Sequence, residues 1–324
     1  MMPRHSSEYG KSWRCATRSW AKGSLSPSGS CSTNYYRTHP STSAVSVMSI
    51  KLSKVFKIQT LHFVPFSSSC DISIVAYSDF ALWSCVDVVS LLRCTRQSLG
   101  IMASSRGALI GRLVLHEPEE EHIDCSILGP SGHAITGDLN QLSRLNLSSD
   151  ARYLIVVEKD AIFQRLAEDR LYNQIPCILI TAKGYPDIAT RFILHRLSQT
   201  FPNMPIFALV DWNPAGLSIL CTYKYGSISM GLESYRYACN VKWLGLRGDD
   251  LQLIPQSAFQ ELKPRDLQIA KSLLSSKFLQ DTHRAELTRM VETGTRAEIE
   301  ALYCHGFDFL GKFIARKIVQ GDYI

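Results

Sequence analysis

The chain has 324 residues, of which 45% are hydrophobic, and a formal net charge of +6 at pH 7. This length allows about two globular domains, and no stretch approaches the roughly 18 consecutive apolar residues of a membrane span, so we expect no membrane association. The positive charge permits nucleic-acid binding without requiring it. The ten cysteines lack any C-x-x-C or zinc-ligand spacing, which favours reduced core thiols in an intracellular protein without structural zinc.

The first fifty residues differ in composition from the rest of the chain. Residues 1–50 are rich in Ser, Thr, Gly and Arg, and Glu8 is their only acid. The composition predicts a disordered basic tail. An organellar transit peptide or a wrongly assembled gene start would have the same composition.

Residues 51–115 are expected to form a winged-helix-like DNA-binding domain with an atypical N-terminal part. The pattern predicts a helix over 84–94, a short second helix over 96–100, and two strands around a turn at 105–107. Helix, helix and β-wing in this order are typical of a common DNA-docking module. Arg106 would lie at the tip of the wing, either as a DNA contact or as a solvated turn residue.

Residues 116–150 have the acids, glycines and polar residues of a connection, and residues 151–324 alternate strands with helices. Strands are predicted at 152–157, 177–182, 206–210 and 241–246, and helices at 159–172, 187–197 and 214–225. Near-continuous apolar strands between amphipathic helices predict an α/β fold, with a mainly parallel sheet covered by helices on both faces. Four polar helical stretches close the chain.

Two of the predicted strands end on acids. Glu158 follows "LIVV", and Asp211 follows "FALV" with Asn213 two positions later. In open α/β sheets the chemistry collects beyond the carboxyl ends of the strands. If these strands are neighbours, Glu158 and Asp211 lie within reach of one Mg²⁺, which accepts a sparse set of oxygen ligands and completes it with water or phosphate. Asn213 could add a third, weak ligand.

Both assignments have structural alternatives. Asn213 followed by Pro214 is a good N-cap and first-turn pair for the next helix. Glu158 could instead pair with Lys159 or Lys183.

The sequence then resembles a known family. The segments "VVEKDAIFQRLAEDR", "ITAKGYPDIATRF", "LVDWNPAGLSILCTYKYGS" and "VKWLGL" are similar to the A subunit of topoisomerase VI. They are more similar to the meiotic double-strand-break transesterases, in particular to their second plant paralogue. The resemblance covers residues 86–324. It implies a winged-helix domain followed by a Toprim domain, whose acids bind Mg²⁺ beside a DNA strand that a tyrosine from the winged helix attacks.

Within this resemblance, Glu158 matches the first Toprim acid and Asp211 the second. Asn213 stands where most of the family has the second Asp of a D-x-D motif. The loss of one negative charge should weaken binding of a second cation.

The resemblance also implies DNA contacts. Lys183, Gly184 and Tyr185 match the loop after the second strand, and Arg106 matches a basic position at the wing. A glycine beside a lysine permits close approach to a phosphate, and an exposed aromatic ring can stack on a base.

The nucleophilic tyrosine motif of the family is not found. It should stand about twenty residues before the position of Asp87, where this chain reads "TLHFVPFSSSCDISIVAYSDFALW". Tyr77 is a weak candidate, because it lies only ten positions before Asp87. Catalysis by this chain is therefore left open.

The resemblance implies double-stranded DNA as substrate, a nuclear location and a role in meiotic recombination. It also implies a paralogous A-type subunit, in a homo- or heterodimer, and a topoisomerase VI B-like partner that supplies ATP hydrolysis. Three functions remain open: a DNA-cleaving transesterase subunit, a non-cleaving DNA-binding or scaffold subunit, and a different Toprim enzyme such as a primase or nuclease. The order of the predicted domains disfavours the third.

Overall fold

The computed structural model describes strands β1 (Thr33–Asn34), β2 (Met48–Ile50), β3 (Leu61–Pro65) and β4 (Ile72–Val75), and residues 95–99, 101–102, 106–117, 122–227, 233 and 235–324. Tyr77 and the helix predicted over 84–94 lie outside these residues, as does most of the predicted tail. The chain divides into two compact units, Met1–Met102 and Ala103–Ile324. The named domains and boundaries given above remain predictions.

The first unit contains a five-stranded sheet in the order β1-β2-β3-β4-β5, with β5 at Ile101–Met102. Its strands are antiparallel except β4 and β5, which are parallel. The short helix predicted over 96–100 is confirmed as a 3₁₀ turn, η1 (Gln97–Leu99). Thr95 caps this turn, since its Oγ1 accepts the backbone N–H of Ser98 at 3.1 Å.

The second unit is built on a six-stranded sheet in the order β14-β13-β11-β12-β6-β9. Its strands are β6 (Ala108–Gly111), β9 (His133–Ala134), β11 (Tyr153–Val157), β12 (Cys177–Thr181), β13 (Ile206–Leu209) and β14 (Val241–Trp243). The four strands β14, β13, β11 and β12 are parallel, which confirms the predicted mainly parallel sheet. Strands β6 and β9 add an antiparallel edge.

Among the described residues, the two strands predicted on either side of 105–107 pair with other strands and not with each other. β5 pairs with β4, whereas β6 pairs with β12 of the central sheet in the register Ala108↔Thr181. The reason is burial, because all four residues of β6 are buried, and a wing strand would expose one face to solvent. The apolar run "ALIG" therefore completes the sheet instead of forming a surface hairpin.

The segment interpreted as a connection is structured within the second unit. Besides β9 it contains α3 (Leu139–Arg144), β8 (Ile123–Asp124) and β10 (Asn146–Ser148). Strands β8 and β10 flank β7 (Val114–His116) in a small antiparallel sheet.

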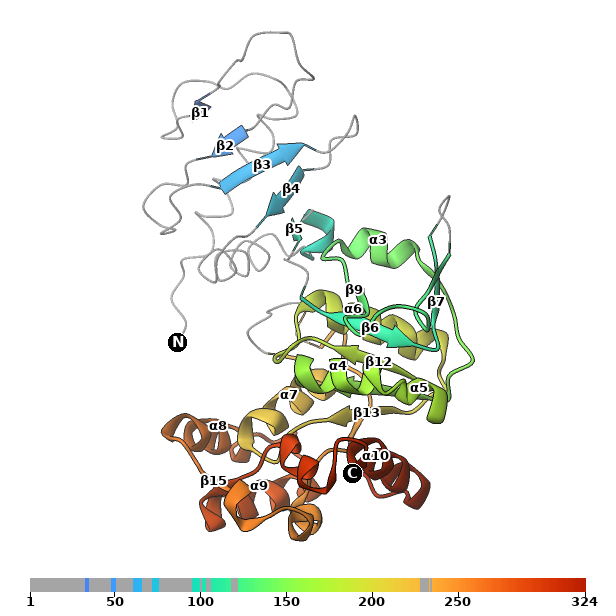
Figure 1. The fold of residues 1–324 in the computed structure, drawn as a ribbon. Helices are drawn as coiled ribbons and strands as arrows, with labels where there is room; N and C mark the ends of the chain where they lie inside the picture. Colours follow the sequence, from blue (N-terminus) through green and yellow to red (C-terminus); the bar gives the residue numbers. More distant parts are fainter. Residues whose placement is uncertain are drawn as a thin grey trace, which may run out of the picture. The chain divides into compact units, whose positions relative to one another are not determined.

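Helices cover both faces of the central sheet, as predicted (Figure 1). They are α4 (Asp160–Glu168), α5 (Leu171–Gln174), α6 (Ile188–Thr200) and α7 (Pro214–Tyr225). From β11 the chain passes through α4 and α5 to β12, its neighbour on one side in the sheet. It then crosses the sheet in the opposite direction, through α6 to β13 and through α7 to β14. Right-handed crossovers therefore place the first pair and the second pair of helices on opposite faces.

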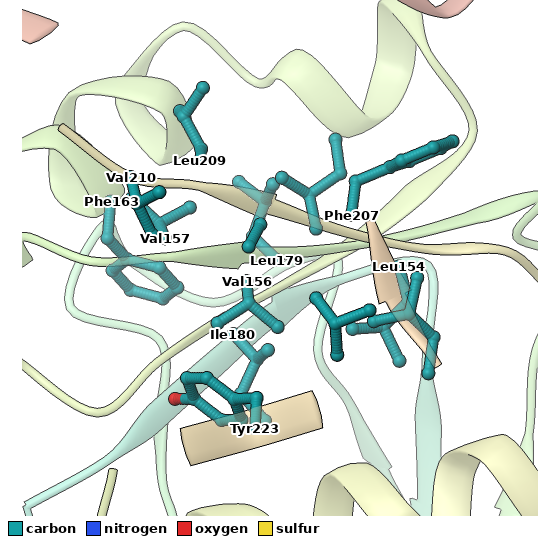
Figure 2. Close-up of a cluster of buried hydrophobic side chains, with 14 of the residues drawn as sticks. Leu154, Val156, Val157, Phe163, Leu179, Ile180, Phe207, Leu209, Val210 and Tyr223 are labelled. Carbon is teal, nitrogen blue, oxygen red and sulfur yellow. The ribbon is translucent and has the colours of Figure 1, made fainter. Parts of the chain in front are cut away.

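Figure 2 shows the two apolar layers that result. Val157, Leu179, Phe207 and Leu209 lie on the side of Phe163 from α4, whereas Leu154, Val156 and Ile180 lie on the side of Tyr223 from α7. Successive strand residues point to opposite faces, so both faces of these strands are buried, and this explains their continuous hydrophobicity. Helix α4 contributes four buried residues to its layer: Ile162, Phe163, Leu166 and Ala167.

The single helix predicted over 159–172 is interrupted at Arg170, whose φ of 49° lies in the left-handed region.

The four closing helical stretches are α8 (Pro264–Leu274), α9 (Asp281–Thr293), η5 (Ile299–His305) and α10 (Phe309–Gln320). In the part of the chain that the structure describes, every helix is too short or too polar to cross a bilayer.

Candidate functional site

The two acids predicted at the strand ends come together. Glu158 directly follows β11, and Asp211 lies two residues after the end of β13. These strands are parallel neighbours in the register Val157↔Leu209, so their carboxyl ends share one edge of the sheet. The backbone N–H of Asp211 donates to Oε2 of Glu158 at 3.0 Å. This edge is the candidate site, and we call Glu158 and Asp211 the inner acids.

The carboxylate of Asp211 is fixed at both oxygens. Its Oδ1 accepts the backbone N–H of Ile299 at 2.9 Å, and its Oδ2 lies 3.0 Å from Nζ of Lys159. The neighbouring Trp212 pairs with Ala297 through two backbone hydrogen bonds of 3.0 and 3.1 Å. The segment before η5 is thereby bound to the end of β13.

Lys159 connects the inner acids to two glutamates that sequence reasoning missed. Its Nζ lies 3.2 Å from Oε2 of Glu298 and 2.6 Å from Oε2 of Glu300. We call Glu298 and Glu300 the outer glutamates. They lie 139 and 141 residues from Lys159, in a stretch that reads as an ordinary polar helix, so the sequence contains no signal for this contact.

Asn213 is an N-cap, as one of the two interpretations predicted. Its Oδ1 accepts the N–H of Gly216 at 2.7 Å at the start of α7, and its Nδ2 lies 3.4 Å from Oδ2 of Asp211. The oxygen that could bind a metal is therefore already used by the helix. Asn213 as a weak metal ligand stays a prediction.

Gly216 packs directly against the inner acids. A Cβ atom there would lie 2.6 Å from the carbonyl oxygen of Asp211 and 3.2 Å from Oε2 of Glu158. Only glycine lets the first turn of α7 approach this closely. The positive end of the helix dipole then lies near the carboxylates and favours negative charge there.

Burial and charge shift the titration of the site. Burial, together with repulsion from Asp211, raises the pKa of Glu158 to about 7. Burial also raises the pKa of Asp211, although the nearby Lys159 opposes this rise. Burial acts to lower the pKa of Lys159, but attraction to Asp211 and the hydrogen bond to Glu300 outweigh it, so this pKa is raised. The inner acids therefore favour a cation beside them.

The two inner acids suit Mg²⁺ better than a metal ion whose ligands all come from the protein. Within the described ranges, no group of three or more His, Cys, Asp or Glu side chains is arranged to hold a metal ion. Two adjacent carboxylates at a helix N-terminus provide the sparse oxygen set that Mg²⁺ completes with water or phosphate.

The Lys183–Tyr185 loop lies at the same edge of the sheet. The N–H of Gly184 donates to the carbonyl oxygen of Glu158 at 2.9 Å. Lys183 and Gly184 have φ values of 57° and 112°, so this turn uses left-handed backbone, which glycine adopts without strain. Nζ of Lys183 lies 3.3 Å from Oδ2 of Asp160, so its ion pair is with Asp160 and not with Glu158. The side chain of Tyr185 is 44% exposed.

Arg106 also lies at this edge of the sheet. It is exposed and precedes β6 by two residues. Because β6 runs antiparallel to β12 with Ala108 opposite Thr181, the start of β6 lies beside the carboxyl end of β12. Arg106 and Lys183 thus flank the same strand end. Tyr77, the remaining candidate, lies outside the described residues.

Comparisons with known proteins agree with this architecture. Residues 153–318, a little over half of the chain, match the Toprim domain of the family that unites the topoisomerase 6 A subunits with Spo11. The chain is 90% identical over 238 residues to "Meiotic recombination protein SPO11-2" of Oryza sativa subsp. indica, and 70% identical over 238 residues to the protein of that name in Arabidopsis thaliana. It is 38% identical over 244 residues to the A subunit of DNA topoisomerase 6 of Arabidopsis thaliana.

These alignments cover 74% of this chain, 62% of each SPO11-2 protein and 56% of the topoisomerase protein. The chain thus spans less than two thirds of the length of these relatives. The matched region includes β11, β12 and β13 with the inner acids, and the central sheet has the mainly parallel order expected of a Toprim domain. The chain belongs to the family of the topoisomerase 6 A subunits and Spo11, with its Toprim domain at residues 153–318.

Proposed function

We propose that this chain is a DNA-binding subunit of a topoisomerase VI-like complex that makes meiotic DNA double-strand breaks and so initiates recombination. The observation that carries the proposal is the hydrogen-bonded pair of inner acids, with the Asp211 N–H at 3.0 Å from Glu158 Oε2. The names of the relatives, which include meiotic recombination proteins and topoisomerase 6 subunits, support the assignment. Acting on chromosomal DNA, the protein would work in the nucleus.

In this proposal Glu158 and Asp211 hold Mg²⁺, and Asn213 contributes weakly at most. When bound, the metal neutralises charge on the DNA phosphate and on the leaving oxygen. Arg106 and Lys183 contact phosphates of the same strand, and Tyr185, which is exposed beside them, stacks on or wedges against a base.

The family reaction is a transesterification. A tyrosine oxygen attacks a DNA phosphodiester, which forms a 5′-phosphotyrosyl link and releases a 3′-hydroxyl. Each protomer cuts one strand, so a double-strand break requires a dimer, with a second copy or a paralogous A-type chain. A B-like partner would supply ATP hydrolysis.

A second function is favoured by two observations of the sequence. The family's tyrosine motif is not found before Asp87, and Asn213 replaces the second acid of D-x-D. A chain with these features could bind DNA and dimerise without cutting, either as a scaffold protein or as a shortened form of a cleaving protein.

The test is Mg²⁺-dependent binding of duplex DNA by the wild type and by Glu158→Gln and Asp211→Asn. Each substitution removes one carboxylate charge with little change in shape, so both should weaken the Mg²⁺-dependent part of the affinity, and Asn213→Ser should do so less. Glu168→Gln on α4, whose side chain is 53% exposed, is the matched control. The metal assignment is wrong if both inner-acid variants keep the Mg²⁺ dependence of the wild type.

A further inference from the structure

We propose that Lys159 regulates metal occupancy at the inner acids by exchanging between Asp211 and the outer glutamates. This inference rests on the proposed Mg²⁺ site and assigns a role to a residue that would not touch the metal. The geometry that motivates it is a single ammonium group that lies 3.2 Å or less from each of three carboxylates.

The contacts of Lys159 differ in strength and in surroundings. Its Nζ lies 2.6 Å from Glu300 and 3.2 Å from Glu298, and it lies 3.0 Å from the buried Asp211. The side chain of Asp211 is 4% exposed, whereas those of the outer glutamates are 36% and 37% exposed. The lysine thus joins a buried carboxylate to a half-exposed pair.

A metal at the inner acids would compete with Lys159 for the same atom. Oδ1 of Asp211 already accepts the N–H of Ile299, and Oδ2 is paired with Lys159. A divalent cation at the buried carboxylate needs electron density from that oxygen, and two cations in a partly buried space repel each other strongly. Metal binding therefore weakens the contact of Lys159 with Asp211.

The outer glutamates provide the alternative position for the displaced ammonium. They already contact Nζ at 3.2 and 2.6 Å, so a small rotation of the lysine side chain moves its charge away from the metal without transferring it to bulk water. Their place in the fold also matters, because they flank Ile299, which holds Asp211 through its N–H. One short segment thus positions a metal ligand and accepts the charge that the metal displaces.

The experiment is calorimetric titration of the full chain with Mg²⁺, without DNA, at mildly alkaline pH. Lys159→Met keeps the aliphatic stem and removes the competing charge, so it should bind Mg²⁺ about tenfold more tightly than wild type. The double substitution Glu298→Gln/Glu300→Gln should bind several-fold more weakly, because Lys159 then stays on Asp211.

The discriminating variant combines all three substitutions. If the outer glutamates act through Lys159, their replacement should have little effect once Lys159 is Met, and the difference from additivity measures the coupling. If they act only as remote negative charges, the same weakening should appear with and without the lysine, and the inference is then wrong. Lys312→Met, which removes an exposed lysine paired with Asp308 on α10, controls for the change in net charge.

Thermal unfolding of each variant separates this role from a structural one. Should Lys159→Met not fold, Lys159→Arg serves instead, because its planar guanidinium holds a carboxylate at two points. It should bind Mg²⁺ more weakly than wild type, and equal or tighter binding would overturn the inference. If the wild type binds Mg²⁺ and Lys159→Met binds it equally or more weakly, the exchange is wrong but the proposed metal site stands. If the wild type binds no Mg²⁺, the proposed site is wrong as well.

Discussion

Gly216 touches the backbone of Asp211: a Cβ atom at Gly216 would lie 2.6 Å from the Asp211 carbonyl oxygen. Since this atom is main chain, the clash cannot be relieved by a rotamer change. Gly216→Ala should therefore displace the start of α7 and lower the free energy of unfolding by about 1–3 kcal/mol. It should also weaken Mg²⁺ binding, because Oε2 of Glu158 lies 3.2 Å from the added carbon. Denaturant unfolding and calorimetry measure the two effects.

Gly129→Ala is the control for this substitution. Gly129 is exposed, and no atom lies within 4 Å of the position that an added methyl group would take, so its replacement should leave both measurements unchanged. Equal stability and Mg²⁺ affinity in Gly216→Ala and wild type would show that the helix start can shift freely.

Two substitutions separate the effect of helix capping by Asn213 from the effect of negative charge at this position. Asn213→Ala loses the bond from the N–H of Gly216 and should destabilise the protein by about 1 kcal/mol. Asn213→Asp keeps a capping oxygen and adds a carboxylate two positions after Asp211, so it should retain most of the stability and bind Mg²⁺ more tightly. Thermal unfolding and Mg²⁺ titration of both variants check this, and tighter binding by Asn213→Ala would contradict it.

The sequence predicted those parts of the site that follow from short-range pattern. An apolar run that ends on an acid identifies a strand and the position of its carboxyl end, so Glu158 and Asp211 could be predicted to share an edge. Asn213 followed by Pro214 predicted the cap. These features depend on residues within a few positions of one another.

Long-range pairing could not be predicted in this way. The run at 108–111 fits a wing strand and a sheet strand equally well, and only its partner β12, which begins at Cys177, decides between them. The outer glutamates reach Lys159 through a chain of 139 residues or more. Periodicity contains no information on such contacts.

Duplex DNA binding should depend on salt through Arg106 and Lys183. Each phosphate contact that is lost should reduce the slope of log affinity against log salt concentration by about 1, so Arg106→Ala should show this decrease. Lys183→Ala should show less, because Nζ of Lys183 already lies 3.3 Å from Asp160.

Arg165→Ala is the matched control for the salt experiment. The guanidinium of Arg165 contacts Asp169, the C-cap residue of α4, at 2.8 Å, so this substitution should not alter the slope. Unchanged slopes in both test variants would place the DNA on another surface.

His283 should make folding sensitive to acid. It is 1% exposed, neither ring nitrogen has a hydrogen-bond partner among the described residues, and its ring stacks on Trp243. Burial, with a smaller effect of Lys224, lowers the pKa of His283 to about 4. The unfolded chain, with an ordinary histidine pKa of about 6.5, binds the proton more readily. The free energy of unfolding should therefore fall as the pH decreases from about 6.5 toward 4, by up to about 3 kcal/mol from this residue.

His283→Phe keeps an aromatic ring against Trp243 and removes the titrating group. Urea unfolding of wild type and variant at about pH 7 and pH 5 should show a smaller loss of stability in the variant. An equal loss in both proteins would assign the acid sensitivity to other groups.

The last prediction concerns cleavage. Covalent cutting needs a nucleophile held about 3 Å from the phosphate that the metal contacts. Between Leu61 and Ser73, where the family pattern requires it, the chain contains serines but no tyrosine. A serine would need a base beside it, and the family reaction uses the more acidic phenol. Tyr77 lies about ten residues from the required position, which corresponds to about 30 Å of extended chain.

We therefore expect this polypeptide to bind DNA without forming a covalent adduct by itself. Incubation with Mg²⁺, duplex DNA and candidate A-type and B-like partners, followed by denaturation in detergent, should release all of the DNA from this chain. An A-type partner with an intact tyrosine motif is the positive control, because its adduct shows that the assembly is active. An adduct on this chain that disappears in Tyr77→Phe would identify Tyr77 as the nucleophile and favour the cleaving function over the scaffold.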